Sequence, residues 1–185
     1  VTSVVGVLRG GLPTEGKRPV VLLRADMDAL PVEELTGLDY ASTNGAMHAC
    51  GHDLHMAMLI GAAHGLCAQR DQLAGDVIFM FQPGEEGHHG ARFMLDEGLL
   101  DVPALSDGTP SPVDAAFALH ITSALPSGWV SGRGGPVMAS ADSMLIRVVG
   151  RSPAVWIVGN SSASMPLMWV AKRPDRRWSV SVPWS

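Results

Sequence analysis

Apolar runs of strand length recur along the first part of the chain, separated by polar and turn-forming residues. Five such runs predict strands: residues 4–8, 20–23, 77–81, 115–119 and 144–149. Continuously apolar runs are typical of strands that are buried on both faces of a sheet. The run at 144–149 instead alternates, as an edge or half-buried strand does.

Two helical segments lie between these strands. Residues 53–69 are apolar on nearly every face and predict a long buried helix, and residues 91–96 predict a short helix that ends near Gly98. Continuous apolar strands separated by helices imply a parallel or mixed sheet that is covered on both faces. The predicted fold class is therefore α/β, with three layers in the order α/β/α.

Charge and composition exclude several classes of protein. Residues 1–150 hold 8 Lys and Arg against 17 Asp and Glu, a net charge of −9. Nucleic acid is not expected as the main partner, because phosphate binding needs a clustered basic face, whereas an acidic body is compatible with metal cations. No apolar stretch reaches the ~18 residues of a membrane span. Two cysteines and the absence of a secretory signal favour the cytoplasm.

Metal-ligating side chains follow three of the predicted strands at the points where the strands end. Asp26 and Asp28 follow the second strand, Glu85 and Glu86 follow the third, and His120 follows the fourth. The carboxyl ends of the strands in an open α/β sheet line the binding crevice. We therefore expect these side chains to meet at one edge of the sheet.

The segment before the long helix adds two more candidate ligands. Cys50 and His52 flank Gly51 in a turn, so both side chains can face one point. Cysteine, histidine and carboxylates together suit zinc or a similar divalent ion. The adjacent Glu85 and Glu86 repel each other unless a cation or a raised pKa relieves them, so one can bind metal while the other acts as a general base. The predicted metal site comprises Cys50, His52, Glu85, Glu86 and His120.

Neighbouring residues are assigned other roles. His48 and His55 flank the cluster, and each is expected to lie behind the ligands or at the surface rather than to bind metal. Cys67 on the long helix is expected to be a small buried hydrophobe. A cysteine hydrolase that uses Cys50 as its nucleophile is the weakest alternative, since a thiolate beside several ligands is better explained as metal-bound.

Four motifs occur in an order that resembles the N-acyl-amino-acid amidohydrolases. They are RADMDALP (24–31), MHACGHDLH (47–55), FQPGEEGHHGA (81–91) and ALHI (118–121). The similarity spans about residues 4–150. These motifs resemble one branch of the zinc aminoacylase/carboxypeptidase family, the branch that contains the hippurate hydrolases and the indoleacetyl-amino-acid hydrolases.

This resemblance implies a role for each site residue and a reaction. It implies two divalent ions, of zinc, manganese or cobalt, with Cys50 bridging them. Glu85 is implied to be the general base, Asp28 to orient a metal-site group, and Asp26 to stand where other branches carry a metal-binding histidine. The implied reaction splits an N-acyl amino acid into a carboxylic acid and a free amino acid. The implied metal ligands are Cys50, His52, Glu86 and His120.

Both ends of the chain depart from the pattern of this family. Val1 lies almost directly at the first strand, where the family has a helical region, and no histidine follows His120 to supply the family's last ligand. Residues 151–185 hold four of the five tryptophans and five basic residues against one acidic residue. They are either an ordinary irregular tail or the product of a reading-frame change.

These departures give the expected organisation of the chain. We expect a partial catalytic domain at 1–140, the first strand of a dimerisation domain at 141–150, and an atypical tail at 151–185. Full-length relatives are expected to be homodimers. The alternative function is a non-catalytic remnant of such an enzyme that still binds metal.

Overall fold

A computed structural model describes residues 2–103, 110–135 and 137, together with the backbone of four later strands. The chain divides into two compact units, Val1–Ala124 and Leu125–Ser185. The expected domain boundaries at residues 140 and 150 fall outside the described residues, so they stay predictions.

The first unit contains four of the five strands and both helices that the apolar pattern predicts. Its strands are β1 (Val4–Leu8), β2 (Val20–Asp26), β3 (Asp76–Gln82), β4 (Val102–Pro103), β5 (Pro110–Ser111) and β6 (Ala115–Ala118). Its helices are α1 (His52–Ala68), the short 3-10 helix η1 (Arg70–Gln72) and α2 (Gly90–Asp96). The apolar pattern does not predict the three short elements β4, β5 and η1. Among the described residues, no helix combines the length and the hydropathy that crossing a membrane would require.

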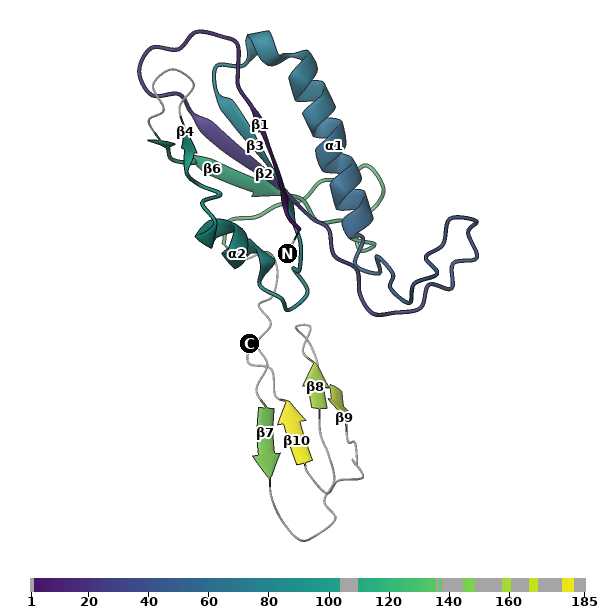
Figure 1. Ribbon diagram of the computed structural model, residues 1–185. Coiled ribbons are helices and arrows are strands. Elements are labelled where there is room, and N and C mark those ends of the chain that lie inside the picture. The colour runs from purple at the N-terminus through teal and green to yellow at the C-terminus, as the bar shows by residue number, and fades with distance from the viewer. Residues whose placement is uncertain are drawn as a thin grey trace. The chain divides into compact units, whose positions relative to one another are not determined.

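Four of these strands form one mixed sheet in the order β1-β3-β2-β6 (Figure 1). Strand β2 runs parallel to both β3 and β6, whereas β1 pairs antiparallel with β3 at one edge. The expected parallel or mixed sheet is thus confirmed. As a consequence, the carboxyl ends of β2, β3 and β6 lie at the same edge of the sheet.

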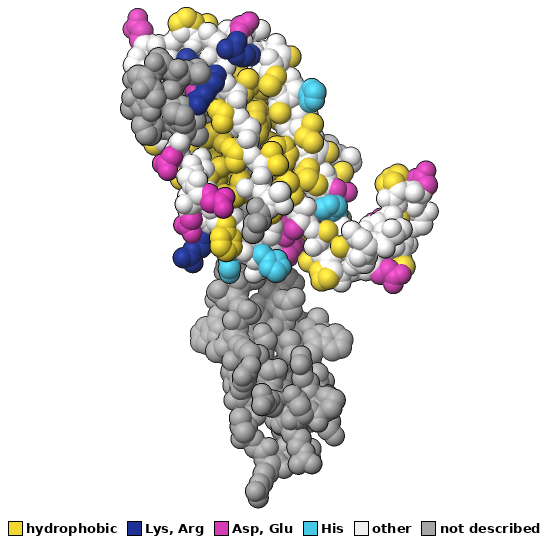
Figure 2. All heavy atoms as spheres, viewed as in Figure 1, with side chains coloured by type: hydrophobic (Ala, Val, Ile, Leu, Met, Phe, Trp, Pro, Cys, Tyr) yellow, Lys and Arg dark blue, Asp and Glu magenta, His cyan; other side chains and the backbone are white. Residues whose placement is uncertain are grey.

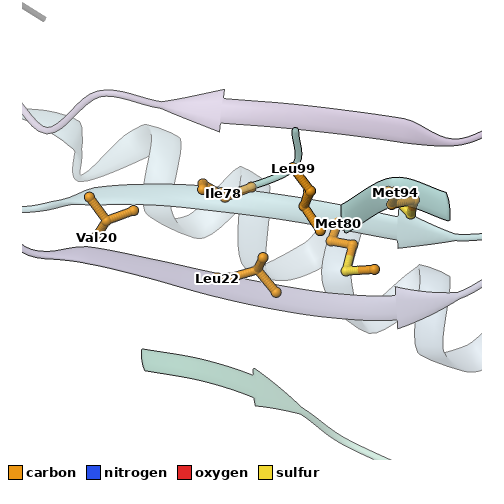
Figure 3. Packing of buried hydrophobic residues seen from close by; sticks show 6 residues of the cluster. All are labelled: Val20, Leu22, Ile78, Met80, Met94 and Leu99. Carbon is orange, nitrogen blue, oxygen red and sulfur yellow. The ribbon is translucent and has the colours of Figure 1, made fainter. Parts of the chain in front are cut away.

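Alternate side chains of β2 and β3 serve a hydrophobic core on each face of the sheet. The core on one face, shown in Figure 3, consists of Val20, Leu22, Ile78, Met80, Met94 of α2 and Leu99. The core on the other face contains Leu8, Ala25, Val77, Phe79 and Leu59 of α1. Because successive side chains of a strand point to opposite faces, a continuously apolar strand can fill both cores. The expected α/β/α layers are therefore present.

Helix α1 is not the fully buried helix that its composition predicts. Its only buried residues are His52, His55 and Leu59, whereas Leu54 and Ile60 are 51% and 50% exposed. Cys67 is also exposed, so its assignment as a buried hydrophobe is wrong. One face of the helix packs on the sheet, and among the described residues nothing buries the opposite face. Hydrophobic side chains accordingly gather on the visible surface of this unit in Figure 2.

A buried carboxylate ties the segment after β1 to the start of β3. Asp76 is 2% exposed, and it accepts hydrogen bonds from Arg9 Nη1 at 2.8 Å, Gly10 N at 3.1 Å and Arg18 Nε at 3.2 Å. Removing one partner of a buried ion pair costs about 3–5 kcal/mol, and less when the other partners reach water. Both arginine side chains are 19% exposed. We expect Asp76→Asn to lower the free energy of unfolding in urea by about 2 kcal/mol.

The same carboxylate predicts a pH dependence of stability. Burial opposes ionisation, but the Arg9, Gly10 and Arg18 donors hold the pKa of Asp76 below its ordinary value of 3.8. A lowered pKa in the folded state stabilises the fold above that ordinary value, and this contribution is lost as the pH falls through the lowered pKa. Below about pH 4, unfolding curves should show the wild type losing stability faster than Asp76→Asn. Parallel losses in the two proteins would contradict this prediction.

The second unit contains a separate sheet. Its strands are β7 (Leu145–Val148), β8 (Val158–Asn160), β9 (Leu167–Trp169) and β10 (Trp178–Ser181). Their order is β7-β10-β8-β9, so β7 lies at an edge, as its alternating pattern predicts. The prediction of an irregular tail is wrong at β8, β9 and β10, because these residues form strands. A reading-frame change stays a prediction.

Candidate metal centre

The carboxyl edge of the sheet brings the five predicted site residues together. Glu85 and Glu86 follow β3, His120 follows β6, and Cys50 and His52 lie where α1 begins. Potential ligand atoms of Cys50, His52 and His120 all lie within 4.8 Å of one another, and so do those of His52, Glu85 and Glu86. Because His52 belongs to both groups, the two groups are adjacent parts of one site.

His52 offers a ring nitrogen that has no hydrogen-bond partner. Its Nδ1 lies 3.0 Å from the backbone oxygen of Asp28, and since a carbonyl only accepts, Nδ1 carries the hydrogen. Nε2 then carries a lone pair, and this atom is buried and has no hydrogen-bond partner. Asp26 Oδ2, which also offers an electron pair, lies 3.5 Å away. A cation bound at Nε2 would remove the cost of burying that lone pair without a partner. The donor set of cysteine, histidine and carboxylate therefore fits a divalent metal ion.

Asp28 connects two of the segments that carry candidate ligands. Its backbone oxygen accepts from His52, and from His48 Nδ1 at 3.1 Å, and its Oδ2 accepts from the backbone N–H of Glu86 at 2.9 Å. Burial works against ionisation, but the backbone N–H groups of Glu86 and Glu85 keep the pKa of Asp28 below its ordinary value. Asp28 thus holds His52 through its backbone oxygen and the Glu85–Glu86 turn through its ionised carboxylate, which is the arrangement that an orienting role requires.

Cys50 and His120 face each other across the site. Cys50 Sγ lies 3.5 Å from His120 Nε2, and His120 Nδ1 donates to the backbone oxygen of Ile121 at 2.6 Å. Burial, with the hydrogen bond and charge of Glu86 and the charge of Glu85, raises the pKa of the Cys50 thiol to about 11. A nucleophilic cysteine needs a lowered pKa, so this setting disfavours the cysteine-hydrolase alternative. A bound cation would displace the thiol proton.

Asp26 and His55 form a buried pair that the sequence pattern did not predict. His55 Nδ1 lies 2.6 Å from Asp26 Oδ1, and Arg24 Nη1 lies 2.7 Å from Asp26 Oδ2. Although burial opposes it, His55 and Arg24 hold the pKa of Asp26 below its ordinary value. His55 is 2% exposed, so it lies behind the ligands rather than at the surface. The sequence signal for its place near the site was its spacing of three residues from His52, which puts the two histidines on one face of the helix.

Gly51, between Cys50 and His52, is required for steric reasons. Its φ is 81°, and a Cβ atom there would lie 2.2 Å from Ile121 Cδ1. Gly51→Ala must strain the backbone and displace Ile121, beside His120, so we expect a loss of about 2 kcal/mol in unfolding free energy together with weaker cobalt binding. Gly45 has a φ of 79° with open space around it. Gly45→Ala is therefore the matched control, and equal effects on cobalt binding would contradict this prediction.

Comparison with known proteins links this arrangement to one family. The model of peptidase family M20/M25/M40 matches residues 22–135, which include every site residue named above. Thermostable carboxypeptidase 1 of Saccharolobus solfataricus is 46% identical over 153 residues, which cover 81% of this chain and 35% of the relative. The IAA-amino acid hydrolase ILR1-like 6 of Arabidopsis thaliana is 38% identical over 162 residues, which cover 85% and 33%. The chain thus spans about a third of the length of these relatives.

A solved structure agrees with the fold. The Bacillus subtilis YXEP protein, described as a dinuclear metal binding peptidase from the M20 family, superposes with a TM-score of 0.64 at 33% identity, and the match covers 90% of this chain and 49% of that one. The α/β fold class and the resemblance carried by the four motifs are thereby confirmed. The chain belongs to peptidase family M20/M25/M40.

Proposed function

We propose that this chain is the metal-binding part of an amidohydrolase that splits N-acyl amino acids into a carboxylic acid and a free amino acid. The observation that carries the proposal is the buried, unpartnered Nε2 of His52, which lies among thiol, imidazole and carboxylate donors from separate segments. Two similarities support it: one relative is named for hydrolysis of IAA-amino acids, and one structural neighbour is described as dinuclear.

The proposed metal ligands share one edge of the sheet. Two divalent ions, of zinc, manganese or cobalt, act when bound as Lewis acids on an amide carbonyl and favour the loss of a proton from water. Cys50 contacts both the imidazole of His120 and the carboxylate of Glu86, which supports its proposed role as a bridging thiolate. The ligands that we propose are Cys50, His52, Glu86 and His120.

Glu85 is the proposed general base. It is exposed, and a carboxylate oxygen lies within 4.8 Å of a ring nitrogen of His52. The Glu85 carboxylate can therefore accept a proton from the attacking water and later deliver it to the leaving nitrogen. Glu86 is less exposed and is the hydrogen-bond partner of the Cys50 thiol, which supports its proposed role as a ligand. The two adjacent glutamates thus have different surroundings, as two different roles require.

A small N-acyl amino acid is the partner that this site favours, and the cytoplasm is the compartment that we propose. Cys50 and Cys67 are both free thiols. A thiolate ligand persists where thiols stay reduced, as they do in the cytoplasm.

Turnover with and without metal tests this proposal. The purified chain, loaded with zinc, manganese or cobalt, should release free amino acid from hippurate or an acetyl amino acid. A chelator should stop the release, and added metal should restore it. Cys50→Ser should abolish it, whereas Cys67→Ser, at an exposed position of α1, should not. A folded chain that binds metal without turnover would favour the non-catalytic alternative, and a folded chain without bound metal would refute both.

A further inference from the structure

A chain of hydrogen bonds, which is buried at Asp26 and His55, joins the end of β2 to the loop that carries His120. We propose that His55, held by Asp26, is a positioning residue that fixes the His120–Ile121 peptide and so directs His120 toward Cys50. The proposed function supplies only the identity of the metal ligands. The hydrogen bonds themselves are features of the metal-free chain.

The two contacts of His55 determine its tautomer. The backbone N–H of Ile121 donates to His55 Nε2 at 3.0 Å, so Nε2 is unprotonated. Nδ1 must then carry the hydrogen, and it donates to Asp26 Oδ1 at 2.6 Å. Both ring nitrogens are therefore used, and the buried ring has one orientation that satisfies both partners.

Ile121 is the point at which His55 acts on His120. Its N–H is bound by His55, and its backbone oxygen accepts from His120 Nδ1 at 2.6 Å. His120 is exposed, so packing constrains it little, and the His55 ring lies edge-on to it with centroids 4.6 Å apart. The orientation that turns His120 Nε2 toward Cys50 thus depends on the backbone of Ile121, which His55 holds at its N–H and His120 contacts at its carbonyl oxygen.

Asp26 gives this chain of contacts a rigid base. It is fully buried, and the guanidinium of Arg24, whose Nε donates to Gln82 Oε1 at 2.9 Å, lies against its second oxygen. The contacts therefore connect β2, β3, α1 and the loop after β6. Asp26, His52 and His55 also lie close enough to hold a cation. A cation bound by His55 would have to break one of its two hydrogen bonds, so geometry favours the positioning role.

Two substitutions separate the two contacts of His55. In His55→Gln the side-chain oxygen is three bonds from Cβ, as Nε2 is, so it can still accept from Ile121 N–H. In His55→Asn the amide is two bonds from Cβ, as Nδ1 is, so it keeps the contact with Asp26 and loses Ile121. His64→Gln, at an exposed position on the same helix, is the control. The readouts are exchange of the Ile121 amide hydrogen in the metal-free chain and cobalt affinity in the loaded chain.

We expect His55→Asn to speed exchange of the Ile121 amide and to weaken cobalt binding about tenfold or more, as the loss of a group that orients a ligand does. His55→Gln and His64→Gln should stay near the wild type in both measurements. Equal losses in the Asn and Gln variants, with circular dichroism showing both folded, would overturn the inference in favour of packing alone. Loss of one cobalt equivalent in both variants, with the Ile121 amide unchanged, would overturn it in favour of His55 as a ligand.

The inference can still be tested if the wild type binds no cobalt or if the His55 variants do not fold. If the wild type binds no cobalt, the proposed function fails, while the Ile121 amide in the metal-free variants still decides the role of His55. If both His55 variants unfold, Asp26→Asn is the milder test, because it keeps the side-chain volume but leaves one acceptor oxygen for two donors, Arg24 Nη1 and His55 Nδ1, and so weakens the hold on His55. Faster exchange of the Ile121 amide in Asp26→Asn would support the inference, and unchanged exchange would overturn it.

Discussion

His52→Ala is expected to remove most of the metal from this protein, lowering the affinity for cobalt or zinc by more than about a hundredfold. His52 belongs to both groups of potential ligands, so its loss opens both parts of the site. Its free Nε2 is buried, and its Nδ1 is fixed by the Asp28 carbonyl, so no other nitrogen can take its place without rearranging the start of α1.

Elemental analysis and calorimetric titration of the folded variant measure this effect. His48→Ala is the matched control, because His48 donates to the same Asp28 carbonyl but belongs to none of the groups of potential ligands in the described residues. His48→Ala should keep its metal. If His52→Ala and wild type bind cobalt equally, His52 is not a ligand and the site is elsewhere.

Glu85→Gln is expected to lower turnover of an N-acyl amino acid by about a hundredfold or more, the scale for a positioned general base. Glutamine keeps the size of the side chain but cannot accept the proton of the attacking water. Metal content should stay unchanged, since Glu85 is assigned to proton transfer rather than to metal binding.

Glu86→Gln, one residue away, provides the contrast. It should lose metal first, and its turnover should recover in part at high metal concentration, because Glu86 contacts Cys50 and is assigned to the ligand set. Kinetics at saturating and limiting cobalt separate the two variants. Near-normal turnover in Glu85→Gln, or a metal-dependent defect there, would show that the two roles are reversed.

The sheet and the place of the site follow from local features of the sequence. The strands β2 and β3 are continuously apolar because each serves a core on both faces, and this leaves an unambiguous pattern. Polar residues that directly follow parallel strands must lie at one edge of the sheet, whatever conformation the connecting loops adopt. The strand pattern alone therefore suffices to place Glu85, Glu86 and His120 at one edge of the sheet.

The errors arise where burial depends on distant segments. The composition of α1 gives no information on how many of its faces are covered, and Leu54, Ile60 and Cys67 are exposed because the sheet covers only one. The pairing of His55 with Asp26 joins residues 29 positions apart, and the spacing of His55 from His52 indicates a shared helix face but not this contact. The strands β8, β9 and β10 of the second unit likewise lack the sustained period of two that would have predicted them.

A crystal structure of the cobalt- or zinc-loaded protein, with anomalous scattering recorded at the metal edge, tests the proposed metal centre most directly. We expect anomalous peaks within bonding distance, about 2.0–2.3 Å, of Cys50 Sγ, His52 Nε2 and His120 Nε2, with a Glu86 oxygen completing the set. Peaks located between Asp26 and His55 instead, or a well-ordered site with no metal near Cys50 and His52, would contradict the assignment of these ligands.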